Sequence, residues 1–103
     1  MKIYLAGPIA GHEDTCAAVF AEAAAKLRAA GHEVFNPIEA EGGTVDAERN
    51  KNIAFRRQCL AKDVAWICNE ADAMALLPGW EHSRGAYAER YLALAIGIPV
   101  RAI

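Results

Sequence analysis

The stretch LLPGWEHSRGAYAER, residues 76–90, contains a strand-to-helix transition that indicates the fold class. An apolar run ends at Pro78-Gly79, and a segment with the pattern of a helix begins near Ser83. A buried strand that leads through a glycine-containing loop into a helix is the basic unit of an α/β protein. This helix also carries Glu89 on a face of small and aliphatic residues, with no basic residue three or four positions away.

The same alternation of strand and helix runs along the rest of the chain. The pattern predicts strands at residues 2–6, 32–36, 71–77 and 99–103, and helices at residues 15–30, 53–69 and 83–96. This order predicts one α/β domain over residues 1–103, with a Rossmann- or flavodoxin-like sheet of about four mostly parallel strands and helices on both faces. Ligands of such sheets bind beyond the carboxyl ends of the strands. Residues 39–52 are polar and contain Gly42-Gly43, so we expect a mobile loop there that closes over a ligand.

Composition and charge argue against several classes of function. The 103 residues are 54% apolar and 23% charged, with a net charge of −2. This balance suits a globular domain and offers no basic surface to a nucleic acid polymer or an anionic membrane, and no apolar run is long enough to cross a membrane. Three cysteines without CxxC spacing indicate reduced thiols and hence a cytoplasmic protein. The histidines are scattered, so we expect neither a metal nor another cofactor.

The isolated charge of Glu89 has a counterpart in the preceding predicted helix. Asp63 lies on an apolar face, with Cys59 one turn before it and Trp66 one turn after it, and it also lacks a local counter-ion. A half-buried carboxylate is costly unless it is hydrogen-bonded or protonated. A backbone amide or a distant arginine would satisfy one such residue, but two of them at the loop end of the sheet favour a site. Glycosidic chemistry uses two carboxylates, because one attacks the anomeric carbon and the other handles a proton.

Three segments together resemble a known superfamily. They are MKIYLAGPIAG at residues 1–11, LAKDVAWICNEADAMALLPG at residues 60–79 and SRGAYAERYLALAIGIPV at residues 83–100. They look like the nucleoside 2-deoxyribosyltransferase-like superfamily, and in particular its small, often phage- or prophage-encoded members with GPxxG and LPGWExSxGAxxE motifs. The late motif is fairly specific, and the resemblance spans nearly the whole chain except residues 39–52. The superfamily includes deoxyribosyltransferases and nucleoside 5′-monophosphate N-glycosidases.

The resemblance implies roles for individual residues. The glutamate at the position of Glu89 is the nucleophile that attacks C1′ of the (deoxy)ribose in the superfamily. The aspartate at the position of Asp63 contacts the sugar and handles the proton of the base. The implied substrate is therefore a nucleoside or nucleotide, and either water or a second base receives the sugar. The implied substrate contacts are Tyr4, Gly7, Ile9, Asp72, Trp80, Ser83 and Gly85.

These contacts serve different parts of the implied substrate. Ser83 matches the loop that holds the 5′ end of a nucleotide, and Gly7 lies in the loop that frames the base. Tyr4 is expected to orient the nucleophile, with a plain core tyrosine as the alternative, and Trp80 is expected to stack on a base. Asp72 opens the third predicted strand, where bonding to local backbone explains it equally well.

The chain departs from the superfamily in its first loop. Nucleotide hydrolases of the superfamily carry a basic residue there for the 5′-phosphate, whereas this loop reads IAGHED; Arg84, or Arg56 and Arg57, are possible replacements. The phosphorylation state of the substrate stays open for this reason. Two other functions also stay open: a non-catalytic nucleotide-binding module, and a phosphoribohydrolase-like enzyme whose PGGxGTxxE motif is matched only in part by PGWEHSRGAYAE. We expect a homodimer or larger homo-oligomer, because so small a core is marginal alone.

Overall fold

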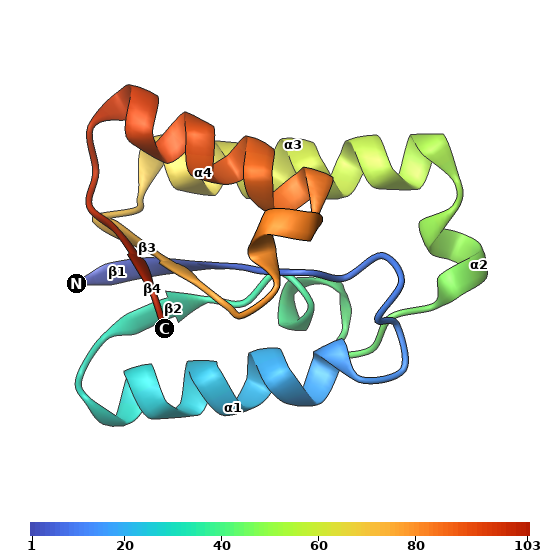
Figure 1. The fold of residues 1–103 in the computed structure, drawn as a ribbon, viewed down its shortest axis with the longest axis horizontal. Helices are drawn as coiled ribbons and strands as arrows, with labels where there is room; N and C mark the ends of the chain where they lie inside the picture. Colours follow the sequence, from blue (N-terminus) through green and yellow to red (C-terminus); the bar gives the residue numbers. More distant parts are fainter.

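The computed structural model describes residues 1–103 and has one four-stranded sheet between two layers of helices (Figure 1). The strands are β1 (Lys2–Ala6), β2 (Glu33–Phe35), β3 (Ala73–Leu76) and β4 (Val100–Ala102). The helices are α1 (Cys16–Ala29), α2 (Ala47–Asn50), α3 (Ile53–Asn69) and α4 (Arg84–Ile96), with the 3₁₀ turns η1 (Glu39–Glu41) and η2 (Trp80–His82). All three strand pairs are parallel and the order is β2-β1-β3-β4. The predicted Rossmann-like α/β class is confirmed, and the sheet is entirely parallel.

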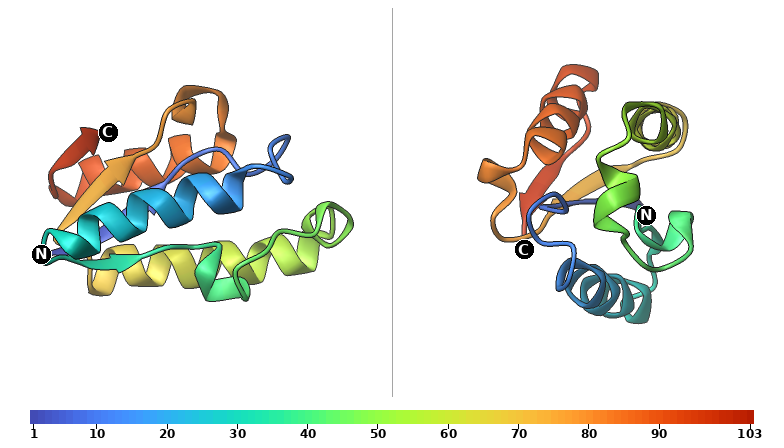
Figure 2. Two further views of the ribbon diagram at one scale, coloured as in Figure 1. Left: turned by 90° about the horizontal axis from the view of Figure 1, so that it is seen from below. Right: turned by 90° about the vertical axis from the view of Figure 1, so that its right-hand side faces the viewer.

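Alternation along β1 divides the core between the two faces of the sheet. Ile3 and Leu5 pack with residues of α1, whereas Tyr4 and Ala6 pack with residues of α3 and α4. Figures 1 and 2 show α1 alone on one face and α3 with α4 on the other. Tyr4 therefore lies beneath the two helices that carry the predicted catalytic carboxylates.

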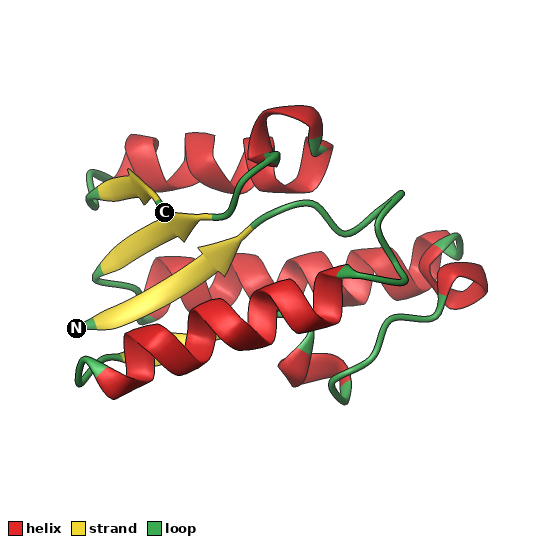
Figure 3. Ribbon diagram, turned by 60° about the horizontal axis from the view of Figure 1, so that its bottom comes forward, coloured by secondary structure: helices red, strands yellow, loops and turns green.

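The strand order reverses between β1 and β3, and their loops meet at this point. β2 lies on one side of β1 and β3 on the other, and the strands point toward the loops that lead into the helices (Figure 3). In sheets of this kind a ligand binds at such a point, in a crevice outside the carboxyl ends of the strands. A Cβ on Gly7 would lie 2.8 Å from Leu77 Cβ, so only glycine allows this approach of the two loops. Gly79 has a φ of +87°, and a Cβ there would lie 3.3 Å from Pro8 Cγ. The GPIAG and LLPG segments thus form one continuous rim of the crevice.

Residues 39–52 contain more regular structure than the predicted loop. The segment includes η1 and α2, and Asp46 Oδ1 caps α2 by accepting from Glu48 N at 2.9 Å and Arg49 N at 3.3 Å. Before it, Asn36 Oδ1 accepts from Ile38 N at 3.0 Å and turns the chain out of β2. The sequence pattern missed these elements because a helix of four residues is too short to show a periodicity. Its expected mobility stays a prediction.

Other differences from the predicted elements are small. β3 and β4 are shorter than predicted at both ends, and α1 begins at Cys16. All three cysteines are free thiols, but only Cys16 is buried; Cys59 is half-buried and Cys68 is exposed. No helix has the length and apolar character needed to span a membrane.

Candidate active site between β1, α3 and α4

A buried hydrogen bond joins the first strand to the last helix. Tyr4 Oη donates to Glu89 Oε2 at 2.7 Å, and the exposed fractions of these residues are 0% and 7%. The Tyr4 ring stacks on Phe35, with centroids 5.5 Å apart, and lies 6.4 Å from the Trp66 ring. Since the sheet and this aromatic cluster hold the ring, the phenol is fixed in its direction toward α4. The prediction that Tyr4 orients Glu89 thereby has a geometric basis.

The second carboxylate, Asp63 of α3, lies close to the same hydroxyl. Asp63 has an exposed fraction of 9%. Burial raises the pKa of Glu89 to about 8; the Tyr4 hydrogen bond opposes this rise and the nearby Asp63 charge adds to it. Burial raises the pKa of Asp63 to about 6, with the Tyr4 hydroxyl again opposing and Glu41 adding. Near neutral pH the two carboxyl groups therefore hold about one proton, mainly on Glu89.

Both carboxyl groups keep oxygen atoms available to a ligand. The Tyr4 hydroxyl donates to Glu89 Oε2, whereas neither Glu89 Oε1 nor the Asp63 carboxyl accepts a hydrogen bond within ordinary distance. The nearby Tyr4 hydroxyl still lowers the pKa of Asp63 against the effect of burial. No fully buried side-chain oxygen lacks a partner. The oxygens without a partner are therefore not completely sealed from solvent.

The start of α4 offers hydrogen-bond donors beside Glu89. Ser83 caps the helix by accepting from Ala86 N at 3.2 Å, which leaves the amides of Arg84 and Gly85 without an intrahelical acceptor. These amides and the helix dipole favour an anion. A Cβ on Gly85 would meet no atom within 4 Å, so there is open space at this point. Gly85 and Glu89 lie four residues apart and hence on one side of the helix.

A small cavity extends from Asp63 away from α4. Its volume is about 70 Å³, and it lies between the loop after β1, residues 37–50 and the first half of α3. Ile9 and Asp63 line it, as the sequence-based site predicts, but so do Asp46 and Arg49, which sequence reasoning missed. The missed residues lie in the one segment that the resemblance does not cover. No three His, Cys, Asp or Glu side chains converge as a metal site would require.

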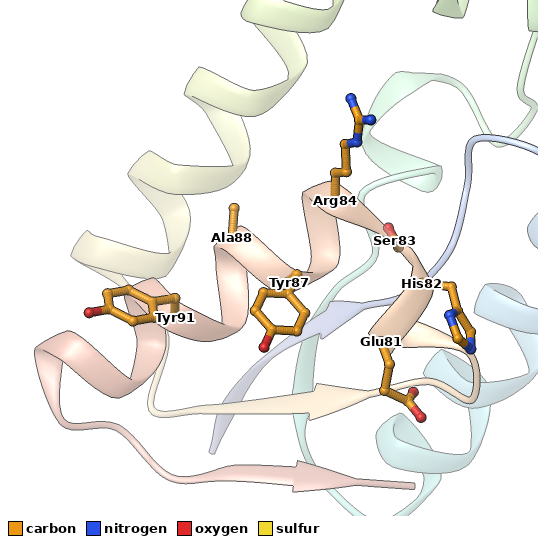
Figure 4. Close-up of a pocket in the computed structure, with 7 residues that line it drawn as sticks. All are labelled: Glu81, His82, Ser83, Arg84, Tyr87, Ala88 and Tyr91. Carbon is orange, nitrogen blue, oxygen red and sulfur yellow. The ribbon is translucent and has the colours of Figure 1, made fainter.

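A larger and more open depression of about 550 Å³ lies on the outer surface of α4. Figure 4 shows the seven residues that line it: Glu81, His82, Ser83, Arg84, Tyr87, Ala88 and Tyr91. Neither Glu89 nor Asp63 is among them, because both side chains point to the sheet side of their helices. The candidate site is therefore defined by the two buried carboxylates and not by the volume of this depression.

Two predicted substrate contacts do not join the central group. Asp72 lies at the amino end of β3, where its Oδ2 accepts from Lys2 N at 2.8 Å, so this placement removes it from the candidate site. The Trp80 ring is packed beside Tyr87, with centroids 5.8 Å apart, and beneath the Arg90 guanidinium at 4.8 Å. The Arg90 guanidinium thus takes up ring surface on which a base would have to stack. Of the other predicted contacts, Tyr4 lies within β1, Gly7 and Ile9 lie in the loop after it, and Ser83 and Gly85 lie at the start of α4.

Comparison with known proteins places this site in a family without assigned chemistry. No curated protein and no solved structure matches the chain. The model of one family, described as a domain of unknown function (DUF4406), matches residues 1–102. That description names no activity, so the function has to be argued from the site itself. Because the match covers almost every residue, the chain belongs to the DUF4406 family.

Proposed function

We propose that this protein cleaves the N-glycosidic bond of a nucleoside or nucleoside 5′-monophosphate through a covalent intermediate on Glu89. One observation carries the proposal: two buried carboxyl groups flank the Tyr4 hydroxyl at the strand-order reversal, and neither has a cation as partner. Retaining glycosidic chemistry needs such a pair, one group as nucleophile and one as acid and base. Hydrolysis and transfer to a second base share this first half of the reaction.

The first step follows from the single proton of the pair. In the reactive form the proton lies on Asp63 and Glu89 is ionised, a state that the positive end of α4 and the developing charge at C1′ both favour. Glu89 Oε1 attacks C1′, and the C1′–N bond breaks with its electron pair moving to the base. The base nitrogen takes the proton of Asp63. The products are a glycosyl ester on Glu89 and a free base.

The second step returns the site to its starting state. Water, or the nitrogen of a second base, attacks C1′ of the ester, and the Asp63 carboxylate takes the proton that the attacking group loses. The C1′–O bond breaks and Glu89 leaves as a carboxylate. Tyr4 acts as a positioning residue in both steps, because its bond to Oε2 leaves Oε1 directed to the sugar.

The sugar and its 5′ end fit the groups along α4. Ser83 and the free amides of the first helical turn suit a 5′-phosphate or hydroxyl, and Glu89 lies further along the same side of the helix. The acidic first loop gives no cation for a phosphate, whereas Arg84 stands at the start of α4. Both 5′-hydroxyl and 5′-phosphate substrates therefore belong in the test.

The test is base release from a panel of nucleosides and 5′-monophosphates, followed by chromatography. We expect release by the native protein and none by Glu89→Ala, with ligand binding retained in the variant. A 2′-fluorinated substrate should slow the second step and leave a sugar adduct that peptide mass spectrometry locates on Glu89. Binding of nucleotides by the native protein without any base release would instead support the non-catalytic module.

We further propose that the protein forms a homodimer through the outer face of α4. Tyr87 and Tyr91 lie on this face (Figure 4) and are 51% and 70% exposed. Leu94 follows Tyr91 by three residues in α4 and is 49% exposed, so it extends the apolar stripe. A dimer would cover these side chains. Light scattering at micromolar concentration should give twice the chain mass, and Tyr91→Glu should shift the mass to that of the monomer. A monomeric native protein would contradict the proposal.

A further inference from the structure

The wall of the cavity next to Asp63 is built by residues 44–50, a part of the chain for which the resemblance implies nothing. We propose that Arg49 and Asp46 in this wall recognise the –CO–NH– edge of the substrate base. The proposal rests on the glycosidase function and names its substrate class. The preferred bases are those with a ring carbonyl beside a ring N–H, such as hypoxanthine, guanine, uracil and thymine, over adenine.

The order of groups along the site places the base in this cavity. A nucleotide is a linear sequence of phosphate, sugar and base. The free amides of α4 suit the 5′ end, and the available oxygen of Glu89 marks the position of C1′. Asp63 lies beside Glu89 and also lines the cavity. The base, on the far side of the sugar from the phosphate, is thereby directed past Asp63 into the cavity.

Arg49 presents hydrogen-bond donors that no carboxylate of the protein occupies. Its guanidinium carbon lies 4.5 Å above the centroid of the Phe55 ring, an arrangement that holds the group by cation–π attraction. Five ion pairs join other lysines and arginines to carboxylates, and Arg49 belongs to none of them. Since a guanidinium has donors only, it selects a partner with an acceptor such as a carbonyl oxygen.

Asp46 supplies the complementary acceptor three residues away. Its Oδ1 accepts from two backbone amides and caps α2, whereas its Oδ2 has no hydrogen-bond partner. An ionised carboxylate has acceptors only. A carbonyl next to an N–H matches this donor and acceptor. Adenine presents an amino donor beside a ring nitrogen acceptor, which is the reverse order. In the same orientation its amino donor would face the Arg49 donors, and its ring nitrogen would face the Asp46 acceptor.

The charge of the cavity favours a base over a phosphate as the partner of Arg49. Glu41, Asp46 and Asp63 all line the cavity, and their carboxylates would repel a dianion. Glu41 is also paired with Lys62 at 2.7 Å, which leaves Arg49 as the unpaired cation there. A neutral base takes a donor from Arg49 and gives one to a carboxylate, so it satisfies both kinds of group.

The cavity has to widen for a base to enter. Its volume of about 70 Å³ is close to that of two water molecules at about 30 Å³ each. Residues 44–50 are held at this wall by caps and by the Arg49–Phe55 contact, and α2, which residues 47–50 form, has no buried residue. Val45 packs against the core and stays in place. An outward shift limited to α2 and the adjacent Asp46 therefore exposes no core, and it lets Arg49 and Asp46 adjust to the edge of the incoming ring.

The test compares two nucleotides that differ mainly at this edge, 2′-deoxyinosine and 2′-deoxyadenosine 5′-monophosphate. We expect kcat/KM of the native protein to favour the inosine substrate by about tenfold or more. Arg49→Met should remove this preference by slowing the inosine substrate and leaving the adenosine substrate nearly unchanged. Asp46→Asn keeps the capping oxygen and should also reduce the preference. Lys51→Met, the same charge change two residues away, is the matched control and should keep it.

A binding experiment separates this inference from the glycosidase function. Binding of free hypoxanthine and free adenine to Glu89→Ala, with and without Arg49→Met, needs no catalysis and is measured by titration calorimetry. A preference for hypoxanthine that Arg49→Met abolishes supports base recognition. If that preference is found while neither nucleotide is cleaved, the result counts against the glycosidase function alone. Equal binding of the two bases, no binding of hypoxanthine, or an equal loss for both bases in Arg49→Met would overturn the inference.

Discussion

At the amino end of the sheet the carboxylates of Glu70 and Asp72 are exposed and paired, whereas at the carboxyl end those of Asp63 and Glu89 are buried without a cation. Glu70 contacts Lys2 Nζ at 3.0 Å, and Asp72 accepts from the amide of Lys2 at 2.8 Å. Water and Lys2 surround the first pair of carboxylates, so the fold buries no charge there. The second pair has pKa values raised by burial. Glu70 and Asp72 therefore connect two segments of the chain through Lys2. Asp63 and Glu89 have no such cation and are the candidates for a catalytic role.

The largest expected effect is on catalysis at the carboxyl end. Glu89→Ala should lower base release by about a thousandfold or more, because it removes the proposed nucleophile and with it the covalent route. Glu70→Ala makes the same change at the amino end and should leave turnover unchanged. The measurement is kcat on one cleaved substrate, with circular dichroism to compare folding. Native turnover in Glu89→Ala would make Glu89 a structural carboxylate and remove the contrast between the two ends.

A smaller catalytic loss is expected from Asp63→Asn. The amide keeps the shape of the side chain but cannot deliver a proton to the leaving base, which typically contributes about a hundredfold. The loss should depend on the base and shrink for leaving groups that need no protonation, such as a p-nitrophenyl glycoside. If the loss were equal for all leaving groups, Asp63 would act on the sugar alone.

The stability of the fold should depend on pH through the buried pair. Burial raises the pKa of Glu89 to about 8 and that of Asp63 to about 6, above the values of an unfolded chain, so the protonated forms stabilise the fold. This stabilisation is complete below about pH 4 and is lost as the pH rises through about 6 and then about 8.

Thermal unfolding of the native protein and of Glu89→Gln checks this dependence. The native protein should lose on the order of a few kcal/mol of unfolding free energy between about pH 5 and about pH 9. Glu89→Gln has no proton to lose at this position, so its loss should be clearly smaller. Parallel curves for the two proteins would mean that Glu89 titrates as an ordinary exposed glutamate.

The smallest effect is expected at the amino end. Asp72→Asn retains an oxygen that can accept from Lys2 N, so the unfolding free energy should change by less than about 1 kcal/mol. Base release should stay the same, because the residue lies at the opposite end of the sheet from Glu89. A specific loss of substrate affinity in this variant would restore Asp72 to the site and contradict its placement.

The alternation of strands and helices and the two anomalous carboxylates can be inferred from the sequence alone. Both are local patterns: a strand, a Pro-Gly loop and a capped helix are written in adjacent residues, and a charge on an apolar helical face is visible from its neighbours at three and four positions. For this reason the sequence alone indicates Glu89 and Asp63 as candidate site residues, and it also indicates the glycine-containing loops around Gly7 and Gly79. The order of these elements also indicated the parallel sheet.

Which of the candidate residues contact one another follows from the tertiary packing and not from the sequence pattern. Tyr4 and Glu89 are 85 positions apart, and their 2.7 Å bond depends on the pleat of β1 and the packing of α4 over it. Asp72 is nine positions from Asp63 in the sequence, yet α3 and the turn after it carry Asp72 to the opposite end of the sheet. Arg49 lies at the Asp63 cavity because α2 and its cap place it there, and this helix of four residues is too short to show a periodic pattern. Contacts between distant residues depend on how the elements pack against one another, which local patterns do not encode.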